Sequence, residues 1–147
     1  MIRDLVLPEA NTPVGGYVMA VRSGDLLFVS GHGPFEDGEP RYLGRLGDTM
    51  TTEQGARAAE VAILNLLATL REELGDLARI VRFVKLLVFV SSTREYAEHH
   101  LVANGATDLL NRALGDRVGT PARSAVGVAS LPLGFSVEIE AVVEVKD

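Results

Sequence analysis

Hydrophobic and polar positions divide the chain into β-rich ends and a largely helical middle. Two β-rich runs within residues 17–31 flank a Ser-Gly-Asp turn at positions 23–25 and predict a hairpin. Residues 31–48 are dense in glycine and proline and predict a loop with space for one short strand. Residues 120–145 contain two further apolar runs around a tight turn, which predicts a closing hairpin.

A long helix is predicted after the loop. Thr51 and Gln54 have the spacing of a capping box, and Gly75 is a natural helix stop. Between them, apolar residues recur at helical spacing and form one stripe, as in a helix that packs one face on a core. This stripe consists of Ala59, Ile63, Leu66, Leu67, Leu70 and Leu74.

A central strand and a second helix follow. Residues 80–90 have the length and β-branched content of a strand and are apolar on both parities, as in a strand covered on both faces. Ser92 and Glu95 mark the start of a second helix that extends to residue 114, with a kink or break expected at Asn104-Gly105. The element order predicts an α+β fold in which one sheet carries two helices on one face.

The last strand has one apolar and one acidic face. Every odd position from 135 to 145 is apolar, and we expect this parity to face the helices. The other parity carries three carboxylates, those of Glu138, Glu140 and Glu144.

The preceding strand carries Arg123 above the small residues Ala125 and Gly127. If residues 131–134 form the turn of a hairpin, Arg123 lies on the face of the carboxylates, although a slip of one residue would reverse this. Small side chains there would let a neighbouring subunit or a ligand approach. The simpler alternative is an exposed cross-strand ion pair between Arg123 and Glu140, worth about 0–1 kcal/mol.

Arg123 and Glu138 cannot meet within one such hairpin. They lie four residues apart along the ladder, which is roughly 13 Å. A site that uses both residues must therefore bridge two subunits.

Composition narrows the classes of partner. The 147 residues predict one domain, residues 1–147, and 14 Lys and Arg against 20 Asp and Glu give a net charge of −6. We therefore expect neither a nucleic acid nor a membrane as partner, although one cationic spot could hold a small anion. Cysteine is absent, which excludes disulfides and thiolate metal sites. With no apparent signal peptide or membrane-spanning run, we expect a cytoplasmic protein.

Several stretches resemble the RidA/YjgF family of reactive-intermediate (enamine/imine) deaminases. The sequence "PARSAVGVASLP", followed by "VEIEA", resembles the C-terminal signature of the family, and "GGYVMAVRSGDLLFVSGHGP" resembles its first hairpin. The long helix, the strand "VKLLVFVSS" and the second helix follow in the family's order. The stretches "GARAAEVAILNLLATLREELGDL" and "VANGATDLL" resemble one branch, whose members are commonly labelled endoribonucleases or translation inhibitors of the L-PSP type.

The resemblance implies a chorismate-mutase-like fold, assembled as a homotrimer with clefts between subunits. It implies that Arg123 holds a substrate carboxylate and that Glu138 holds the hydrolytic water. It also implies cleft positions for substrate binding at Tyr17, Ser30, Gly31 and Ala125. Three positions depart from the family pattern, where a proline, a frequent cysteine and a frequent larger residue are replaced by Gly16, Ala125 and Gly127.

The implied reaction is hydrolysis of a 2-imino acid to a 2-keto acid and ammonia. An arginine fork suits the substrate carboxylate, a backbone carbonyl such as that of Gly31 can accept the iminium N–H, and a glutamate can orient water and take its proton. This chemistry requires neither a metal nor an organic cofactor.

Two alternatives stay open. One is a non-catalytic trimer that binds a small carboxylate-bearing molecule in the same clefts. The other is an endoribonuclease, for which His32 or the pair His99-His100 would supply acid and base. The acidic charge and the absence of a basic stripe disfavour the endoribonuclease.

Overall fold

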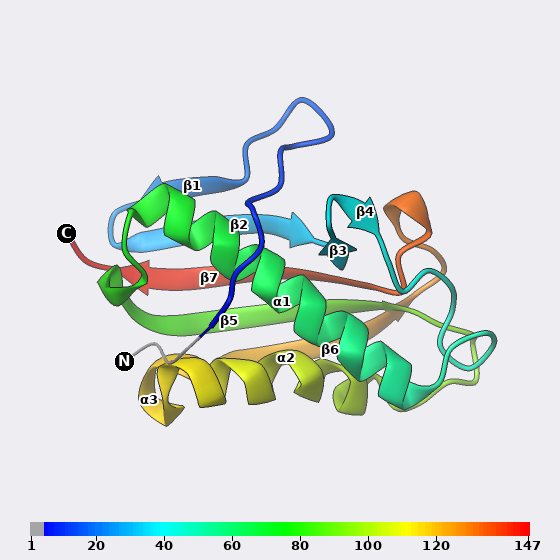
Figure 1. The fold of residues 1–147 in the computed structure, drawn as a ribbon. Coiled ribbons are helices and arrows are strands. Elements are labelled where there is room, and N and C mark those ends of the chain that lie inside the picture. Colours follow the sequence, from blue (N-terminus) through cyan, green and yellow to red (C-terminus); the bar gives the residue numbers. More distant parts are fainter. Residues whose placement is uncertain (1–4) are drawn as a thin grey trace.

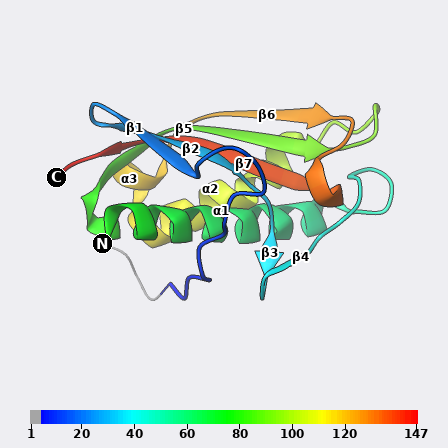
Figure 2. The ribbon, with the colours of Figure 1, turned by 90° about the horizontal axis from the view of Figure 1, so that it is seen from above.

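A computed structural model describes residues 5–147, and within this range a five-stranded sheet carries two long helices on one face (Figures 1 and 2). The strand order is β1-β2-β7-β5-β6. These strands are β1 (Ala20–Ser23), β2 (Leu26–His32), β5 (Ile80–Ser91), β6 (Ala122–Val128) and β7 (Val137–Val145). The helices are α1 (Thr52–Leu74), α2 (His99–Leu114) and the short α3 (Asp116–Gly119), with 3-10 turns η1 (Leu77–Arg79) and η2 (Pro132–Gly134). The predicted α+β class, with both long helices on one face, is confirmed.

The predicted first hairpin and loop are also confirmed. β1 and β2 are antiparallel and are joined by a turn at Gly24. Its φ of +62° causes no steric strain in glycine, because glycine has no Cβ. The loop that follows contains a small hairpin of β3 (Phe35–Glu36) and β4 (Glu39–Pro40). Both turn residues of this hairpin, Asp37 and Gly38, have positive φ, as a tight two-residue turn demands.

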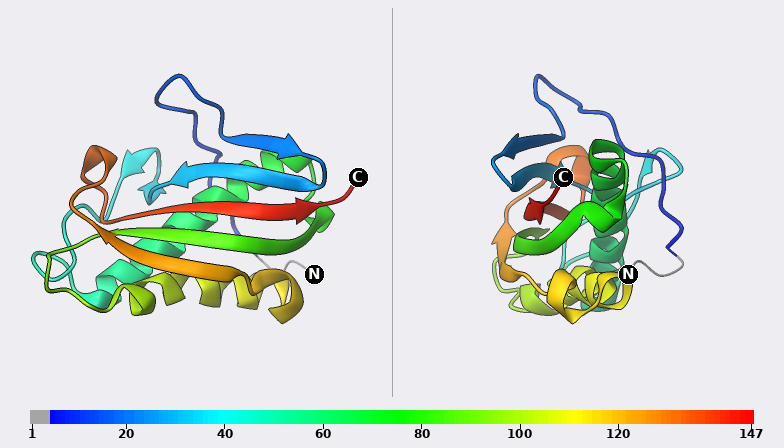
Figure 3. Two further views of the ribbon diagram at one scale, coloured as in Figure 1. Left: turned by 180° about the vertical axis from the view of Figure 1, so that it is seen from behind. Right: turned by 90° about the vertical axis from the view of Figure 1, so that its left-hand side faces the viewer.

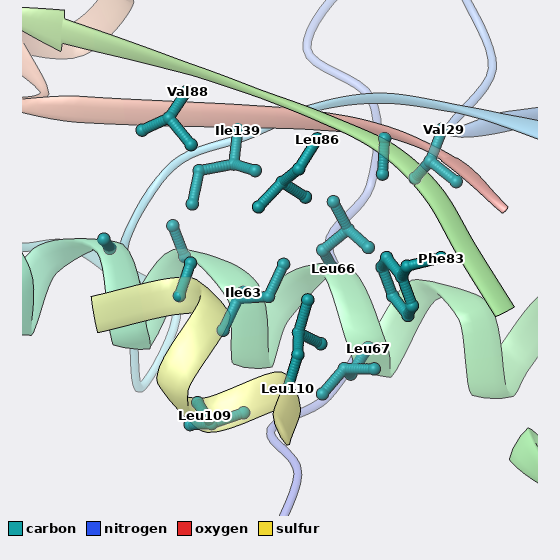
Figure 4. Packing of buried hydrophobic residues seen from close by; sticks show 14 of the residues in the cluster. Val29, Ile63, Leu66, Leu67, Phe83, Leu86, Val88, Leu109, Leu110 and Ile139 are labelled. Carbon is teal, nitrogen blue, oxygen red and sulfur yellow. The ribbon is translucent and has the colours of Figure 1, made fainter. Parts of the chain in front are cut away.

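Helix α1 begins and ends where the sequence predicts. The Thr51 hydroxyl accepts from the Gln54 backbone N–H at 3.2 Å, and the Gln54 side chain accepts from the Thr51 N–H at 2.9 Å. The predicted apolar stripe is buried and packs between the sheet and α2 (Figure 4). Gly75, at φ +80°, donates its N–H to the Arg71 carbonyl and ends the helix.

The second helix differs from the prediction at two points. It begins at His99 and not near Ser92, because Ser92 and Thr93 donate their N–H groups to Val128 and Leu46 outside any helix. It also passes through position 105 without a break. A Cβ at Gly105 would overlap the Ala56 carbonyl oxygen of α1, so this glycine permits the close crossing of two helices.

The predicted closing hairpin is wrong. β6 does not pair with β7. It lies at the sheet edge and pairs in parallel with β5, while β7 pairs antiparallel with both β5 and β2 (Figure 3). The chain passes through η2 between the two strands and returns to the middle of the sheet. A strand with one fully apolar parity is well placed at the centre, where both its edges are hydrogen-bonded.

The new pairing reverses the predicted orientation of β6. Arg123 is level with Leu86, which is fully buried on the helix side, so the odd residues of β6 face α2. A Cβ at Gly127 would meet His99 Nε2 at 2.6 Å. The small residues of β6 therefore make room for α2. The alternative ion pair between Arg123 and Glu140 does not form, because these residues lie on opposite faces of the sheet.

The core fills the layer between the sheet and the two helices (Figure 4). The expected parity of the last strand is confirmed, since all odd positions from 135 to 145 are buried. On the opposite face of the sheet, no helix is formed by the part of the chain that the structure describes (Figure 2). Among residues 5–147, no helix combines the length and apolar character needed to cross a membrane.

Replacing Gly105 with alanine tests the close helix crossing. Alanine is favoured over glycine by about 1 kcal/mol in an isolated helix, but here the added methyl group would overlap the α1 backbone. We expect the free energy of unfolding in urea to fall by about 1–3 kcal/mol. Gly16→Ala is the matched control, because a Cβ there meets no heavy atom within 4 Å. Equal stability of the two variants would contradict the crossing.

Candidate functional site

A cavity of about 910 Å³ opens where β2 ends and β7 begins. Its walls come from the segment before β1, the β3–β4 hairpin and the η2 turn, which lie near one another in Figure 1. Three of the predicted site residues line it, namely Tyr17, Gly31 and Glu138. Ser30, Ala125 and Arg123 do not.

Glu138 lies against the backbone of Gly31. A Cβ at Gly31 would come within 2.7 Å of Glu138 Oε2, so a larger residue at this position would displace the carboxylate. The carboxylate is half-buried, and this burial raises the pKa of Glu138, with the nearby charge of Glu140 adding to the effect. A carboxylate with a raised pKa is a better base near neutral pH. The cavity thus has a candidate general base in its wall.

Ser30 supports this wall without facing the cavity. Its hydroxyl donates to the Val18 carbonyl at 2.7 Å, and its N–H donates to the Met19 carbonyl at 2.8 Å. The pairing of β2 with β7 is irregular between Val29 and His32. A β-bulge of this kind changes the direction of nearby side chains and often occurs next to a functional site. Ser30 therefore fastens the segment that carries Tyr17 to β2.

His32 is a buried anchor between β2 and α1. Its Nδ1 lies 2.6 Å from the Ser30 carbonyl, so Nδ1 carries a proton, and Nε2 lies 2.7 Å from the Thr69 hydroxyl, which donates to it. Burial lowers the pKa of His32, against the opposing effect of the Ser30 carbonyl. Both ring nitrogens are occupied, which leaves His32 poorly suited to the acid–base role of an endoribonuclease. The hydrogen bond between His32 and Thr69 joins residues 37 positions apart, so no local pattern in the sequence predicts it.

Asn65 holds the loop beneath the cavity. This buried residue of α1 donates to the Phe35 carbonyl at 2.9 Å and to the Val61 carbonyl at 3.0 Å. The sequence analysis missed it, although an asparagine within an apolar helical face is a signal that could have identified it.

Arg123 is fixed on the helix-covered face of the sheet by α2. Its Nη1 donates to Asn104 Oδ1 at 2.8 Å and to Thr107 Oγ1 at 3.2 Å, and Nη2 donates to the His100 carbonyl at 3.2 Å. A guanidinium has five N–H donors, so two of them, including Nε–H, make no hydrogen bond to residues 5–147. The roles of Asn104 and Thr107 were not predicted. Arg123 is thus held in a fixed position by α2, and two of its N–H groups can donate to a ligand.

One chain does not bring Arg123 and Glu138 together. Arg123 is level with Leu86 and Ala141, so Glu138 lies three residues further along β7 and two strands away. These offsets amount to about 10 Å along the strands and about 10 Å across them. The two side chains also project from opposite faces of the sheet.

Residues 8–145 match the family model described as Endoribonuclease L-PSP. The chain belongs to this family, also called RidA/YjgF. Protein TCP17 of Trypanosoma cruzi is 44% identical, over 96% of this chain and 88% of that protein. The RutC family protein y4sK of Sinorhizobium fredii is 32% identical, over 97% and 98% of the two chains.

Solved structures show the same fold. Atu1372 from Agrobacterium tumefaciens is 42% identical with a TM-score of 0.90, covering 97% of this chain and 87% of that one. A candidate endoribonuclease from Shewanella oneidensis is 30% identical with a TM-score of 0.92, covering 96% and 93%. RidA from a Psychrobacter species is 28% identical with a TM-score of 0.64, covering 93% and 94%.

The raised pKa of Glu138 predicts a specific pH dependence of stability. The folded state binds the Glu138 proton more tightly than the unfolded state, so the free energy of unfolding falls as pH rises from about 4.5 to the folded-state pKa. Glu138→Gln cannot ionise and lacks this fall. Its stability relative to wild type should therefore rise with pH across that window and level off above it.

Carboxyl ¹³C NMR titration measures the pKa directly, with Glu140→Gln as the matched control. This variant removes the smaller cause of the shift, so the pKa of Glu138 should decrease slightly and stay above its ordinary value. A pKa at or below the ordinary value in wild type would show that burial does not act on this carboxylate.

Proposed function

We propose that the protein hydrolyses reactive 2-imino and enamine acids to 2-keto acids and ammonia, as a homotrimer with sites between subunits. The observation that carries the proposal is the half-buried Glu138, with its raised pKa, against the Gly31 backbone in the wall of a large cavity. Membership of the family that includes RidA supports the same activity.

The chemistry requires one water and one base. Water adds to the C=N carbon while Glu138 accepts a proton from it, and the imine nitrogen becomes an amine. Glu138 then passes this proton to the amine, the C–N bond breaks with release of ammonia, and the proton of the hydroxyl group moves to Glu138 as the carbonyl of the keto acid forms. The Gly31 carbonyl accepts the iminium N–H, and Tyr17 lines the cleft.

A carboxylate substrate needs a cation that this cavity does not contain. Among residues 5–147, the cavity is lined by three acidic side chains, of Glu9, Asp37 and Glu138, and by no lysine or arginine. Arg123 stands on an edge strand and has two N–H donors without a partner among residues 5–147. A second copy of the chain that presents its Arg123 to the cavity completes the site.

The uncovered face of the sheet supports the assembly. Phe28 and Val126 on this face are 47% and 41% exposed, and Leu87 and Phe89 are half-buried between them. Apolar side chains gathered on one open face are typical of a surface that another subunit covers.

Light scattering should give about three times the chain mass of 15.7 kDa.

A carboxylate-binding trimer without turnover is the main alternative. Escherichia coli TdcF, which has this fold at 22% identity, was solved with bound serine. Both functions use Arg123, and turnover separates them. The endoribonuclease is disfavoured by the acidic charge of the chain, and both ring nitrogens of His32 are already hydrogen-bonded.

Mixing two inactive variants tests the shared site. Arg123→Ala removes the carboxylate fork, and Glu138→Gln keeps size and polarity but removes the base, which contributes about 10²–10⁴-fold. Refolded together in equal amounts, they should form trimers in which about a quarter of the interfaces pair an intact arginine with an intact glutamate. Activity should then return to about a quarter of the wild-type level.

The assay generates imines with an amino-acid oxidase and traps them with semicarbazide, so that deaminase activity lowers the semicarbazone yield. Each variant refolded alone is the control. No recovery on mixing would place both residues in one chain or outside the site. If wild-type protein leaves the semicarbazone yield unchanged for every amino acid, the result contradicts the deaminase proposal and favours the carboxylate-binding trimer.

A further inference from the structure

The cavity beside Glu138 is much larger than a small imino acid requires. Its volume of about 910 Å³ lies near the upper end of the range for pockets that enclose drug-sized ligands, about 300–1,000 Å³. The reacting carbon, the carboxylate and the water occupy only the part next to Glu138 and Gly31. The remaining space can hold a substantial side chain.

Apolar side chains form much of the wall of this remaining space. Met19 and Val14 contribute from the segment before β1, and Leu133 from the η2 turn, where it is 52% exposed. The rings of Phe35 and Phe135 meet edge to face with centroids 5.1 Å apart. Burial of an aliphatic or aromatic ligand group against such a surface contributes favourably to the free energy of binding.

Gly33 keeps this aromatic wall in place. A Cβ at position 33 would overlap the Phe135 ring, so glycine lets the ring lie directly on the loop backbone. The loop is held from below by the hydrogen bond of Asn65 to the Phe35 carbonyl. The wall is therefore built into the fold.

The charges around the cavity act against a second carboxylate. Apart from Glu138, the lining includes Glu9 on the segment before β1 and Asp37 at the tip of the β3–β4 hairpin. A substrate with an acidic side chain would bring its negative charge close to them, with no lysine or arginine among the residues of 5–147 that line the cavity.

We propose that this cavity selects 2-imino acids with large apolar side chains, aromatic ones above all, and rejects those with acidic side chains. The inference rests on the proposed function, because it assumes that the imine carbon reacts at Glu138. Leu133 supplies an apolar wall for the side chain, and Asp37 supplies part of the repulsion.

A panel of imines tests the selection in the wild-type protein. Amino-acid oxidases would generate the imines of phenylalanine, leucine, alanine and glutamate. We expect kcat/KM for the phenylalanine-derived imine to exceed that for the alanine-derived imine by at least about tenfold. The glutamate-derived imine should be hydrolysed more slowly than the alanine-derived one.

Two asparagine substitutions separate the apolar and the electrostatic contributions. Leu133 and Asp37 have φ of +61° and +53°, a conformation that asparagine tolerates well, so neither substitution strains the backbone. Leu133→Asn should lower kcat/KM for the phenylalanine-derived imine by roughly 3–10-fold and affect the alanine-derived imine less. Asp37→Asn should raise kcat/KM for the glutamate-derived imine by about 2–5-fold, more than it changes kcat/KM for the phenylalanine-derived imine.

The outcomes distinguish this inference from the proposed function. Turnover with equal or better use of the alanine-derived imine would overturn the inference and leave the deaminase standing. If no imine is hydrolysed, calorimetric binding of phenylpyruvate, pyruvate and 2-oxoglutarate decides the selectivity of the cavity. Tighter binding of phenylpyruvate, weakened in Leu133→Asn, supports the inference, and equal affinities overturn it.

Discussion

The pairing of β7 between β2 and β5 is the constraint on which the rest of the structure depends. Its alternate side chains are buried against the helices, which fixes Glu138 on the other face beside Gly31. Because β7 holds the central place, β6 is left at the edge and pairs in parallel with β5. That pairing turns Arg123 toward α2, where Asn104 and Thr107 hold its guanidinium.

The same constraint divides the chemistry between two surfaces. The cavity has a candidate base, an acidic lining and no cation among residues 5–147, while the edge strand carries a fixed arginine with unused donors. Each surface lacks what the other provides. An assembly in which β6 of one subunit meets the cavity of the next would join the two, and this is why we propose that the reaction takes place between subunits and not within a single chain.

Local periodicity was enough to predict some elements and not others. The limits of α1 and the buried parity of β7 follow from capping residues and alternation, which depend on neighbours in the sequence. The strand with which β6 pairs cannot be predicted in this way, because β6 would show the same alternation of residues in a hairpin and at a parallel sheet edge. The face of the sheet on which Arg123 lies depends on which of these pairings forms. Gly105 shows a similar ambiguity, since a helical glycine can mark either a break or a close crossing. Asn104 and His32 act through contacts with distant segments, which periodicity cannot detect.

A crystal structure with bound 2-ketobutyrate tests the central claim most directly, because this keto acid carries the carboxylate of the proposed substrate and the carbon at which water is added. The account predicts the carboxylate in bidentate contact with Arg123 of one subunit and the keto carbon next to Glu138 and Gly31 of its neighbour. A ligand held by Arg123 and Glu138 of the same chain, or bound away from both residues, would contradict it.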